Sequence, residues 1–460
     1  MHRLLSRSGR RASVVLTSVL TLATAVAGVL VASPAPAEAA NRVTPGNFTG
    51  YGFDQCVTPS QGAMDAWLTA SPYWAVGIYI AGDSRFCGDD KQRNLTPEWV
   101  ATQLRNGWRL LPITVGPQAS CSARYKDKVR IDPDPTDNYV AARTQGRLEA
   151  RDTVKRARAL GIAAKSTLWY DLEAYDIGNQ RCRESSLHFL SAWTRTLRNL
   201  GFVSGVYSSA ASGIRALDDA RVLEPGRYVM PDRVWIAEWV KPEDYRQPPT
   251  ANPPSLLSAF VRHDGWLPKR RMRQYRGDHD ETYGGVTINI DTNYLDLGRG
   301  TLPGKKFTYC GGVRVDFPQY RVLSQGDRKP QVRALQCLMK RKRLYDGKVS
   351  GFYNRGTERA VRRYQRARGL RGDGRMLRST WTYLLSEGAR TPVVKIGSGG
   401  NPVRRVQRSL NAASRAGLEV DGIFGPSTTR AVRVYQAQVG LRRTGVVAPD
   451  TWARLQAGRL

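Results

Sequence analysis

Short apolar segments recur along the first 300 residues and are separated by polar or amphipathic stretches. Their length and their content of β-branched and aromatic residues predict strands rather than helices. The eight predicted strands cover 49–54, 74–80, 109–115, 166–171, 202–208, 233–239, 271–275 and 286–291.

Helix signals lie between the earlier strands. Pro59-Ser60 opens one predicted helix, and Thr96-Pro97 followed by Glu98 caps another. Longer amphipathic helices are expected over 139–160 and 184–200, and a glycine follows each of them.

Strands that alternate with helices indicate an α/β fold. Eight such strands over residues 40–300 predict a parallel (β/α)8 TIM-like barrel, with a doubly wound open sheet as the alternative. The Pro-rich stretch 241–260 is expected to be a long loop.

The pattern changes to a tandem repeat after Gly300. Identical or similar residues recur at an offset of 71 without gaps, which chance does not explain. Matching sets are Gly351-Phe352-Tyr353 with Gly422-Ile423-Phe424, Tyr364-Gln365 with Tyr435-Gln436, and Thr380-Trp381 with Thr451-Trp452. Each repeat is predicted to be a small helical unit in which these tyrosines and tryptophans pack rather than bind.

The repeats resemble the peptidoglycan-binding-domain-1 family. The second keeps the family's loop as Asp421-Gly422-Ile423-Phe424-Gly425, followed by Thr428. The first has Ser350 and Asn354 at the positions of Asp421 and Gly425, so its turn is altered. The resemblance implies that peptidoglycan is the partner.

The N-terminus has the features of an export signal. A basic segment precedes an almost wholly apolar stretch over 14–32, and Ala37-Glu38-Ala39 is a small-x-small cleavage site. The expected organisation is therefore a signal peptide over 1–39, a barrel over 40–300, and repeats over 301–390 and 391–460. The alternative is an uncleaved membrane anchor, because the apolar stretch could span a bilayer. After cleavage we expect a secreted or cell-wall protein without a stable membrane span.

The formal net charge is +32, and it is unevenly distributed. Residues 301–460 contain 33 Lys and Arg against 9 Asp and Glu, which leaves a net of only +8 for the first 300 residues. A basic tail favours an anionic partner. Export argues against nucleic acid and for anionic wall polymers beside peptidoglycan, although codon usage and solubility would also explain the arginines. A monomer is expected.

Six cysteines remain after the export signal, and an even number in an oxidising compartment predicts disulfides. Cys310 and Cys337 lie apart from the others and are expected to pair. Three pairings are open to the other four, and adjacent strands favour Cys56–Cys87 with Cys121–Cys182. The absence of a CxxC pair or another metal-ligand set gives no indication of a metal or cofactor.

Four acidic residues lie where a barrel enzyme would need them. Asp54 ends the first predicted strand, Asp171 ends the fourth with Glu173 two residues further, and Asp291 ends the last. The carboxyl ends of barrel strands form the active-site face. One protonated and one ionised carboxyl group are what glycosidic bond cleavage requires, and crowding of like charges raises one pKa. We therefore expect Glu173 to be the acid and Asp171 its charged partner, with Asp54 and Asp291 orienting substrate or water.

Several motifs along residues 47–298 resemble an actinobacterial glycoside-hydrolase-like barrel family of unknown function, which is similar to the Chalaropsis-type lysozymes. They are Gly52-Phe53-Asp54-Gln55-Cys56, Tyr170-Asp171-Leu172-Glu173, Gly205-Val206-Tyr207-Ser208-Ser209, Trp235-Ile236-Ala237-Glu238-Trp239, Gln274-Tyr275 and Ile290-Asp291. The resemblance implies an N-acetylmuramidase-like site with the same four acids. It also implies that Tyr207, Trp239, Gln274 and Tyr275 flank the sugar.

Three functions follow as hypotheses. The first is an exported muramidase-like hydrolase that the repeats hold on peptidoglycan. The second is a catalytically silent barrel that binds wall glycan as a scaffold. An amidase is the third, and the lack of a recognisable metal-ligand set counts against it.

Overall fold

The computed structural model describes residues 41–125, 127–239, 250–298 and 307–460. The expected signal peptide, 1–39, lies outside the described residues, and so does the first part of the expected loop 241–260, up to residue 249. Among the described residues no helix is both long and apolar enough to cross a bilayer.

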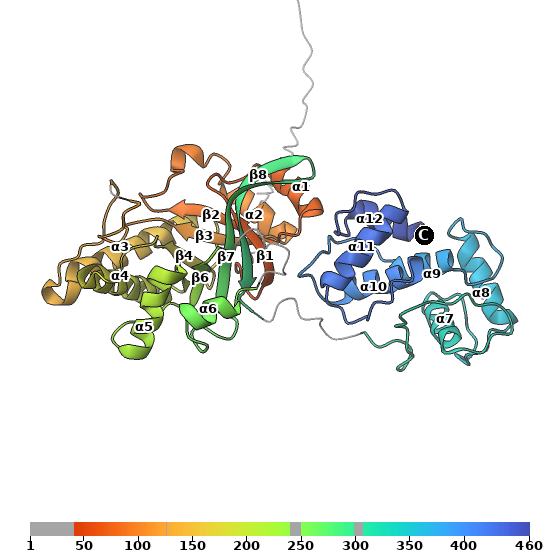
Figure 1. The fold of residues 1–460 in the computed structure, drawn as a ribbon. Coiled ribbons are helices and arrows are strands. Elements are labelled where there is room, and N and C mark those ends of the chain that lie inside the picture. Colours follow the sequence, from red (N-terminus) through yellow and green to blue (C-terminus); the bar gives the residue numbers. More distant parts are fainter. Residues whose placement is uncertain (1–40, 126, 240–249, 299–306) are drawn as a thin grey trace, which may run out of the picture. The chain divides into compact units, whose positions relative to one another are not determined.

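Eight strands form one closed barrel in the order β1 to β8, which confirms the predicted barrel (Figure 1). The strands are β1 Thr49–Asp54, β2 Ala75–Ala81, β3 Arg109–Thr114, β4 Thr167–Asp171, β5 Val203–Ser209, β6 Arg233–Ala237, β7 Arg271–Tyr283 and β8 Val286–Asp296. The helices around it are α1 Gln61–Ala70, α2 Pro97–Asn106, α3 Thr136–Ala159, α4 Gln180–Asn199, α5 Arg215–Leu223 and α6 Pro254–Ala259. Short helical turns are η1 Asp89–Lys91 and η2 Ala210–Ile214.

The last strand corrects the expected all-parallel barrel. Strands β1 to β7 pair with one another in parallel, but β8 runs antiparallel to both β7 and β1. A hairpin through Gly284 and Gly285, both at positive φ, joins β7 to β8, and a hairpin allows only antiparallel pairing. The expected long loop over 241–260 is also corrected in part, because α6 forms near its end.

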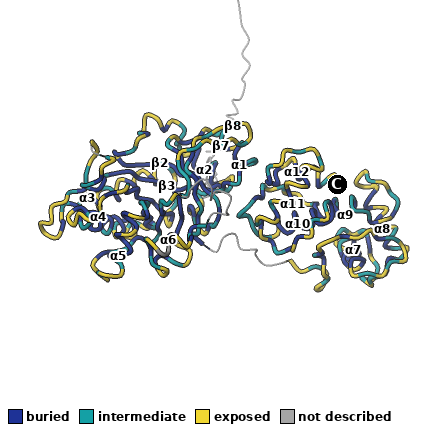
Figure 2. Tube along the Cα trace, viewed as in Figure 1, coloured by how far each residue is buried: buried dark blue, intermediate teal, exposed yellow. Residues whose placement is uncertain are grey.

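Alternating strand residues divide the barrel's apolar side chains into two clusters. Leu111, Trp169 and Trp235 belong to an inner cluster with Met272 and Leu295. Their chain neighbours, such as Leu110 and Tyr170, belong to a larger cluster that includes apolar residues of α1 to α5. The buried strands and the exposed outer helix faces are visible in Figure 2. This arrangement leaves the strand ends as the place for polar side chains.

The tail consists of two three-helix repeats. The first contains α7 Pro330–Arg341, α8 Arg355–Arg366 and α9 Arg378–Ser386. The second contains α10 Asn401–Ala413, α11 Pro426–Gln438 and α12 Pro449–Gln456. The predicted packing residues Trp381, Trp452, Tyr364 and Tyr435 are all buried, so they form cores and not a binding face. The expected boundaries at residues 300 and 390 stay predictions.

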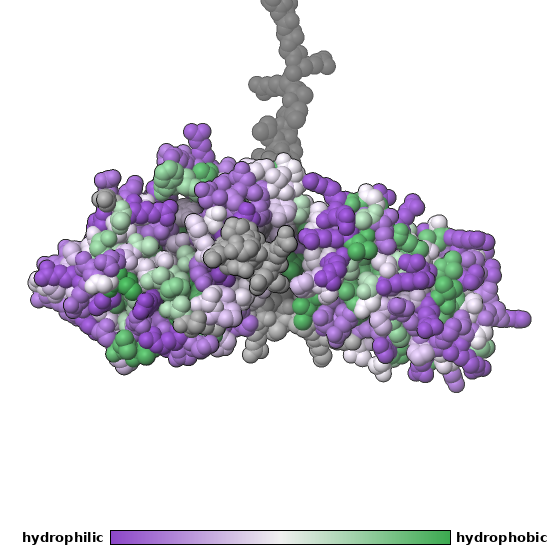
Figure 3. Space-filling view, in the orientation of Figure 1, coloured by the Kyte–Doolittle hydropathy of each residue, from purple (hydrophilic) through white to green (hydrophobic). Residues whose placement is uncertain are grey.

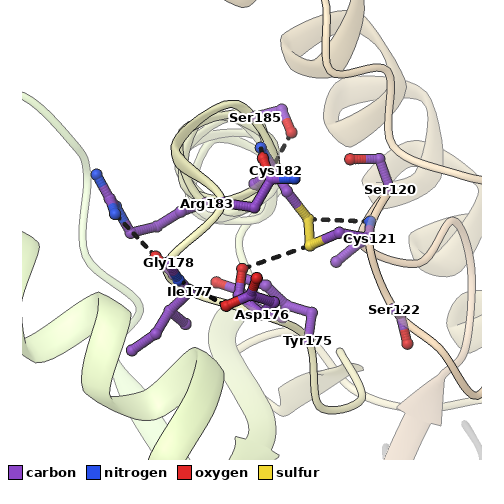
Figure 4. Close-up of a disulfide and its surroundings, with 12 residues drawn as sticks. Ser120, Cys121, Ser122, Tyr175, Asp176, Ile177, Gly178, Cys182, Arg183 and Ser185 are labelled. Carbon is purple, nitrogen blue, oxygen red and sulfur yellow. Dashed lines mark hydrogen bonds between the residues drawn. A yellow bond between two sulfur atoms is a disulfide. The ribbon is translucent and has the colours of Figure 1, made fainter.

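All three predicted disulfides are present: Cys56–Cys87, Cys121–Cys182 and Cys310–Cys337. Figure 4 shows Cys121, on the loop after β3, joined to Cys182 in the first turn of α4. The loop that follows β4 is anchored beside this bond, since Arg183 donates to Ile177 O at 2.8 Å. Two of the three disulfides, Cys56–Cys87 and Cys121–Cys182, therefore brace segments that follow the barrel strands.

Hydrophilic residues predominate on the molecular face drawn in Figure 3, where apolar residues form small separate patches. Near the barrel mouth, two large aromatic side chains, Phe86 and Trp239, are nevertheless exposed to solvent.

Candidate active site

A cavity of about 460 Å³ opens at the mouth of the barrel, and all four predicted acids line it. Asp54, the Asp171–Glu173 pair and Asp291 come from three segments that are each more than a hundred residues apart along the chain. The structure thus brings together the acids that the sequence places far apart. Within the described residues, no group of three or more His, Cys, Asp or Glu is arranged to hold a metal ion.

Asp54 is almost completely buried, with 3% of its surface exposed. Asn293 donates a hydrogen bond to its Oδ1 at 2.6 Å, and the Tyr79 hydroxyl donates to its Oδ2 at 3.3 Å. Burial and the neighbouring Asp291 carboxylate raise the pKa of Asp54 to about 8. A Cβ at Gly77 would lie 2.4 Å from the Asp54 Cβ, so this glycine on β2 makes room for the carboxyl group.

The side chain of Gln118 holds the Asp171–Glu173 segment in place. Its amide Nε2 donates to the Asp171 backbone oxygen at 2.8 Å, and its Oε1 accepts from the Glu173 backbone N–H at 2.9 Å. Asp171 itself is buried, and its Oδ1 has no hydrogen-bond partner. Burial and the adjacent Glu173 raise the pKa of Asp171 well above its usual range.

Glu173 lies closer to solvent, beneath a loop that follows β3. The Arg124 guanidinium lies 3.3 Å from Glu173 Oε2, and its own side chain is largely exposed. Tyr125 also hydrogen-bonds to the Glu173 carboxylate. Burial raises the pKa of Glu173, while Arg124 and Tyr125 act in the opposite direction.

Asp291 reaches the site through the register between β1 and β8, which pairs Asp54 with Asp291. Because β8 is antiparallel and continues to Asp296, Asp291 is not at its carboxyl end as predicted. The Asp278 backbone N–H donates to Asp291 Oδ1 at 2.6 Å, yet burial raises the pKa of Asp291 overall. The prediction that Asp291 ends the last strand is therefore wrong, and the antiparallel register with β1 is what places it beside Asp54.

Gln274 connects the acids to the predicted sugar-binding residues. Its Nε2 donates to Asp291 Oδ2 at 3.1 Å and to Asp54 Oδ1 at 3.4 Å. Its Oε1 accepts from the Tyr207 hydroxyl at 3.0 Å and from the Trp239 indole N–H at 3.1 Å. Tyr207, Trp239 and Gln274 all line the cavity.

Tyr275 is the exception among the predicted site residues, because it is not one of the residues that line the cavity. It follows Gln274 directly on β7, and successive strand residues point to opposite faces. Its hydroxyl hydrogen-bonds to Thr292 instead. The expectation that Tyr275 flanks the substrate is corrected.

Sequence reasoning missed Tyr79, Gln118, Arg124 and Asn293. Asn293 lies two residues after Asp291 and so shares its strand face, which is a signal that the sequence did contain. Gln118 and Arg124 lie in the long segment after β3, where no periodicity indicates which side chains turn inward.

Residues 65–295, half of the chain, match the family described as Rv2525c-like, glycoside hydrolase-like domain. The chain belongs to this family. Residues 328–384 and 399–455 each match the peptidoglycan binding domain family, which confirms the tandem repeat. Both resemblances inferred from the motifs are therefore confirmed.

Among known proteins, the chain is 40% identical over 65 residues to an uncharacterised protein of Kitasatospora aureofaciens, covering 14% of this chain and 55% of that protein. It is 42% identical over 52 residues to an autolytic lysozyme of Clostridium acetobutylicum, covering 11% of this chain and 16% of the lysozyme. The chain thus spans about half or less of the length of these relatives. A family 25 glycosyl hydrolase of Bacillus anthracis is 14% identical, with 54% of this chain and 89% of that chain covered and a TM-score of 0.32.

Proposed function

We propose that this protein hydrolyses the glycan strands of peptidoglycan in a muramidase-like reaction at the mouth of the barrel. The observation that supports the proposal most directly is the convergence of four carboxyl groups with raised pKa values on one cavity. Burying several acids together costs free energy, and enzymes that cleave glycosides use such pairs.

Glu173 is the acid in this proposal. It is the most solvent-accessible carboxyl group of the Asp171–Glu173 pair, so it can reach the glycosidic oxygen of a bound strand and donate its proton. Asp171 lies deeper. Repulsion between the two neighbouring carboxylates favours a state in which one of them keeps a proton near neutral pH. An ionised carboxylate of the cluster then stabilises positive charge on the sugar, while Asp54, Asp291 and Gln274 orient substrate or water.

The match to peptidoglycan binding domains and the relationship to a lysozyme support a cell-wall polymer as the substrate. Repeats that bind the same insoluble polymer would keep the barrel at a high local substrate concentration. Three disulfides agree with a protein that works outside the cytoplasm. We therefore propose that the protein is exported to the cell wall.

The test is to incubate purified protein with peptidoglycan and to detect new reducing ends by mass spectrometry. Replacing Glu173 with Gln should lower the rate by about 10²–10⁴-fold, which is the usual contribution of a general acid. The control is Glu98→Gln, on the exposed surface of α2, which should leave the rate unchanged. Release that survives the Glu173 change would contradict the assignment of the acid.

One observation favours the scaffold hypothesis as a second candidate. Arg124 forms an ion pair with Glu173, and a paired carboxylate gives up its proton more readily. In that case the cavity would bind glycan without cleaving it. Tight binding to peptidoglycan without new reducing ends, in both the native protein and Arg124→Ala, would decide for the scaffold.

A further inference from the structure

A second cavity of about 700 Å³ lies between the two repeats, far along the chain from the barrel's acids. Its walls come from the end of α7, from α9 and the connection that follows, and from the first turns of α10. The repeats are joined around it, since Arg408 Nε donates to Asp316 Oδ1 at 2.6 Å and Asn411 Nδ2 donates to Phe317 O at 2.9 Å. The cavity is therefore a fixed feature of the tandem arrangement and would not exist in a single repeat.

Cationic side chains dominate the polar part of this cavity. Arg341, Arg390 and Arg405 line it, and no ion pair joins any of the three to a carboxylate of the described residues. Lys342 and Arg408 also line it, but they are paired with Glu387 and Asp316. A concave site with three uncompensated cations favours an anionic ligand.

Aromatic rings hold two of these three cations, Arg405 and Arg341, in position. The Arg405 guanidinium lies 3.8 Å from the ring centre of Trp452 and donates to the Arg390 backbone oxygen at 2.8 Å. Its Nε is buried and has no partner. Arg341 lies 4.6 Å from the ring centre of Phe307. A guanidinium that is fixed in this way loses less entropy when it binds a carboxylate in a forked geometry.

The rest of the wall is aliphatic. Val315, Leu338, Leu384, Leu385, Pro392 and Pro402 line the cavity beside the cations. A polyol phosphate has anionic groups for the cations but no apolar groups for the aliphatic wall. A short peptide with free carboxylates and alanine methyl groups has groups of both kinds. We propose that the cavity between the repeats binds the carboxylate-bearing peptide stem of peptidoglycan.

This proposal rests on the wall-binding part of the proposed function and not on hydrolysis by the barrel. It explains why two repeats are present, because only the pair creates the cavity. It also differs from binding by each repeat alone, since residues of both repeats contribute cations. Removing the cations should therefore weaken peptide binding, while cleavage of soluble glycan by the barrel should be unchanged.

The test measures binding of the wall tetrapeptide L-alanyl-γ-D-glutamyl-meso-diaminopimelyl-D-alanine to the purified full chain by calorimetry. Arg341→Ala combined with Arg390→Ala should weaken binding at least about tenfold, because each lost contact is to a charged group. Both side chains are exposed, so the fold should be unaffected. The matched control is Arg442→Ala with Arg443→Ala, which removes the same charge from an exposed loop away from the cavity and should leave binding unchanged.

Two further ligands identify the chemistry. The tetrapeptide with methylated carboxylates should no longer bind to the protein. An oligomer of glycerol phosphate should bind more weakly than the unmodified tetrapeptide. Three results would each overturn the proposal: no binding of the tetrapeptide to the native protein, an equal loss of tetrapeptide affinity in the cavity and control variants, or stronger binding of glycerol phosphate than of the tetrapeptide. Release of reducing ends from soluble glycan, measured with the same preparations, reports separately on the barrel.

Discussion

A buried amide in the repeats and a buried acid in the barrel differ in how their polar atoms are paired. In the repeats, the buried amide of Gln407 accepts from Gly422 N–H at 3.0 Å and donates to Asp421 Oδ1 at 2.7 Å. At the barrel mouth, Asp171 is buried with one carboxylate oxygen unpaired. A satisfied buried amide stabilises a fold, whereas a buried acid without a partner costs free energy. The Gln407 amide therefore stabilises its repeat, whereas the buried Asp171 carboxyl group costs the barrel stability.

The comparison predicts opposite effects of one substitution on activity and stability. Asp171→Asn should lower glycan cleavage by about 10²-fold or more and should raise the thermal midpoint near pH 8, because it removes a buried charge. Reducing-end release and thermal unfolding measure the two effects. A variant that is both less active and less stable would show that Asp171 serves the fold.

The pH dependence of stability should also be opposite to that of an ordinary carboxylate. The pKa of Asp54 rises from 3.8 to about 8 on folding, so the folded state holds a proton that the unfolded chain releases between these values. Stability from this group is therefore present below about pH 4 and is lost as the pH rises towards 8.

The measurement compares denaturant unfolding of the native protein and Asp54→Asn from pH 4 to pH 9. The free-energy difference between the two proteins should change by a few kcal/mol, on the order expected for a buried group. Parallel curves over that range would contradict the raised pKa.

The repeats should respond to loss of an amide in the usual way. Gln407→Ala leaves the N–H of Gly422 and the backbone oxygen of Ile423 without their partner. It should lower the local opening free energy of residues 421–428 by about 1–3 kcal/mol. Hydrogen exchange of that segment measures the effect, and cleavage of soluble glycan by the barrel should be unchanged.

The smallest effect distinguishes the two repeats. Gln336 donates to Ser350 at 3.5 Å, where Gln407 donates to the Asp421 carboxylate at 2.7 Å. Since hydrogen bonds to charged groups are stronger, Gln336→Ala should cost about 1 kcal/mol less than Gln407→Ala. Hydrogen exchange over 350–357 and 421–428 compares them, and equal losses would mean that the altered turn of the first repeat has no energetic consequence.

The sequence by itself determined most of the strands and helices, the tandem repeat and the four acids, and it favoured the disulfide pairs that the structure contains. These features follow from local periodicity, from identical residues at one spacing, and from residue types at strand ends. These signals describe a segment and its immediate neighbours along the chain. They therefore do not predict which distant segments come into contact.

Only the tertiary structure decided how distant segments meet. It made β8 antiparallel, so that register with β1 and not a strand terminus places Asp291 beside Asp54. It turned Tyr275 away from the cavity, and from a segment without periodicity it brought Arg124 into the cavity and Gln118 against the backbone of Asp171 and Glu173. The cavity between the repeats likewise depends on how two similar units pack, and no pattern within either unit contains that information.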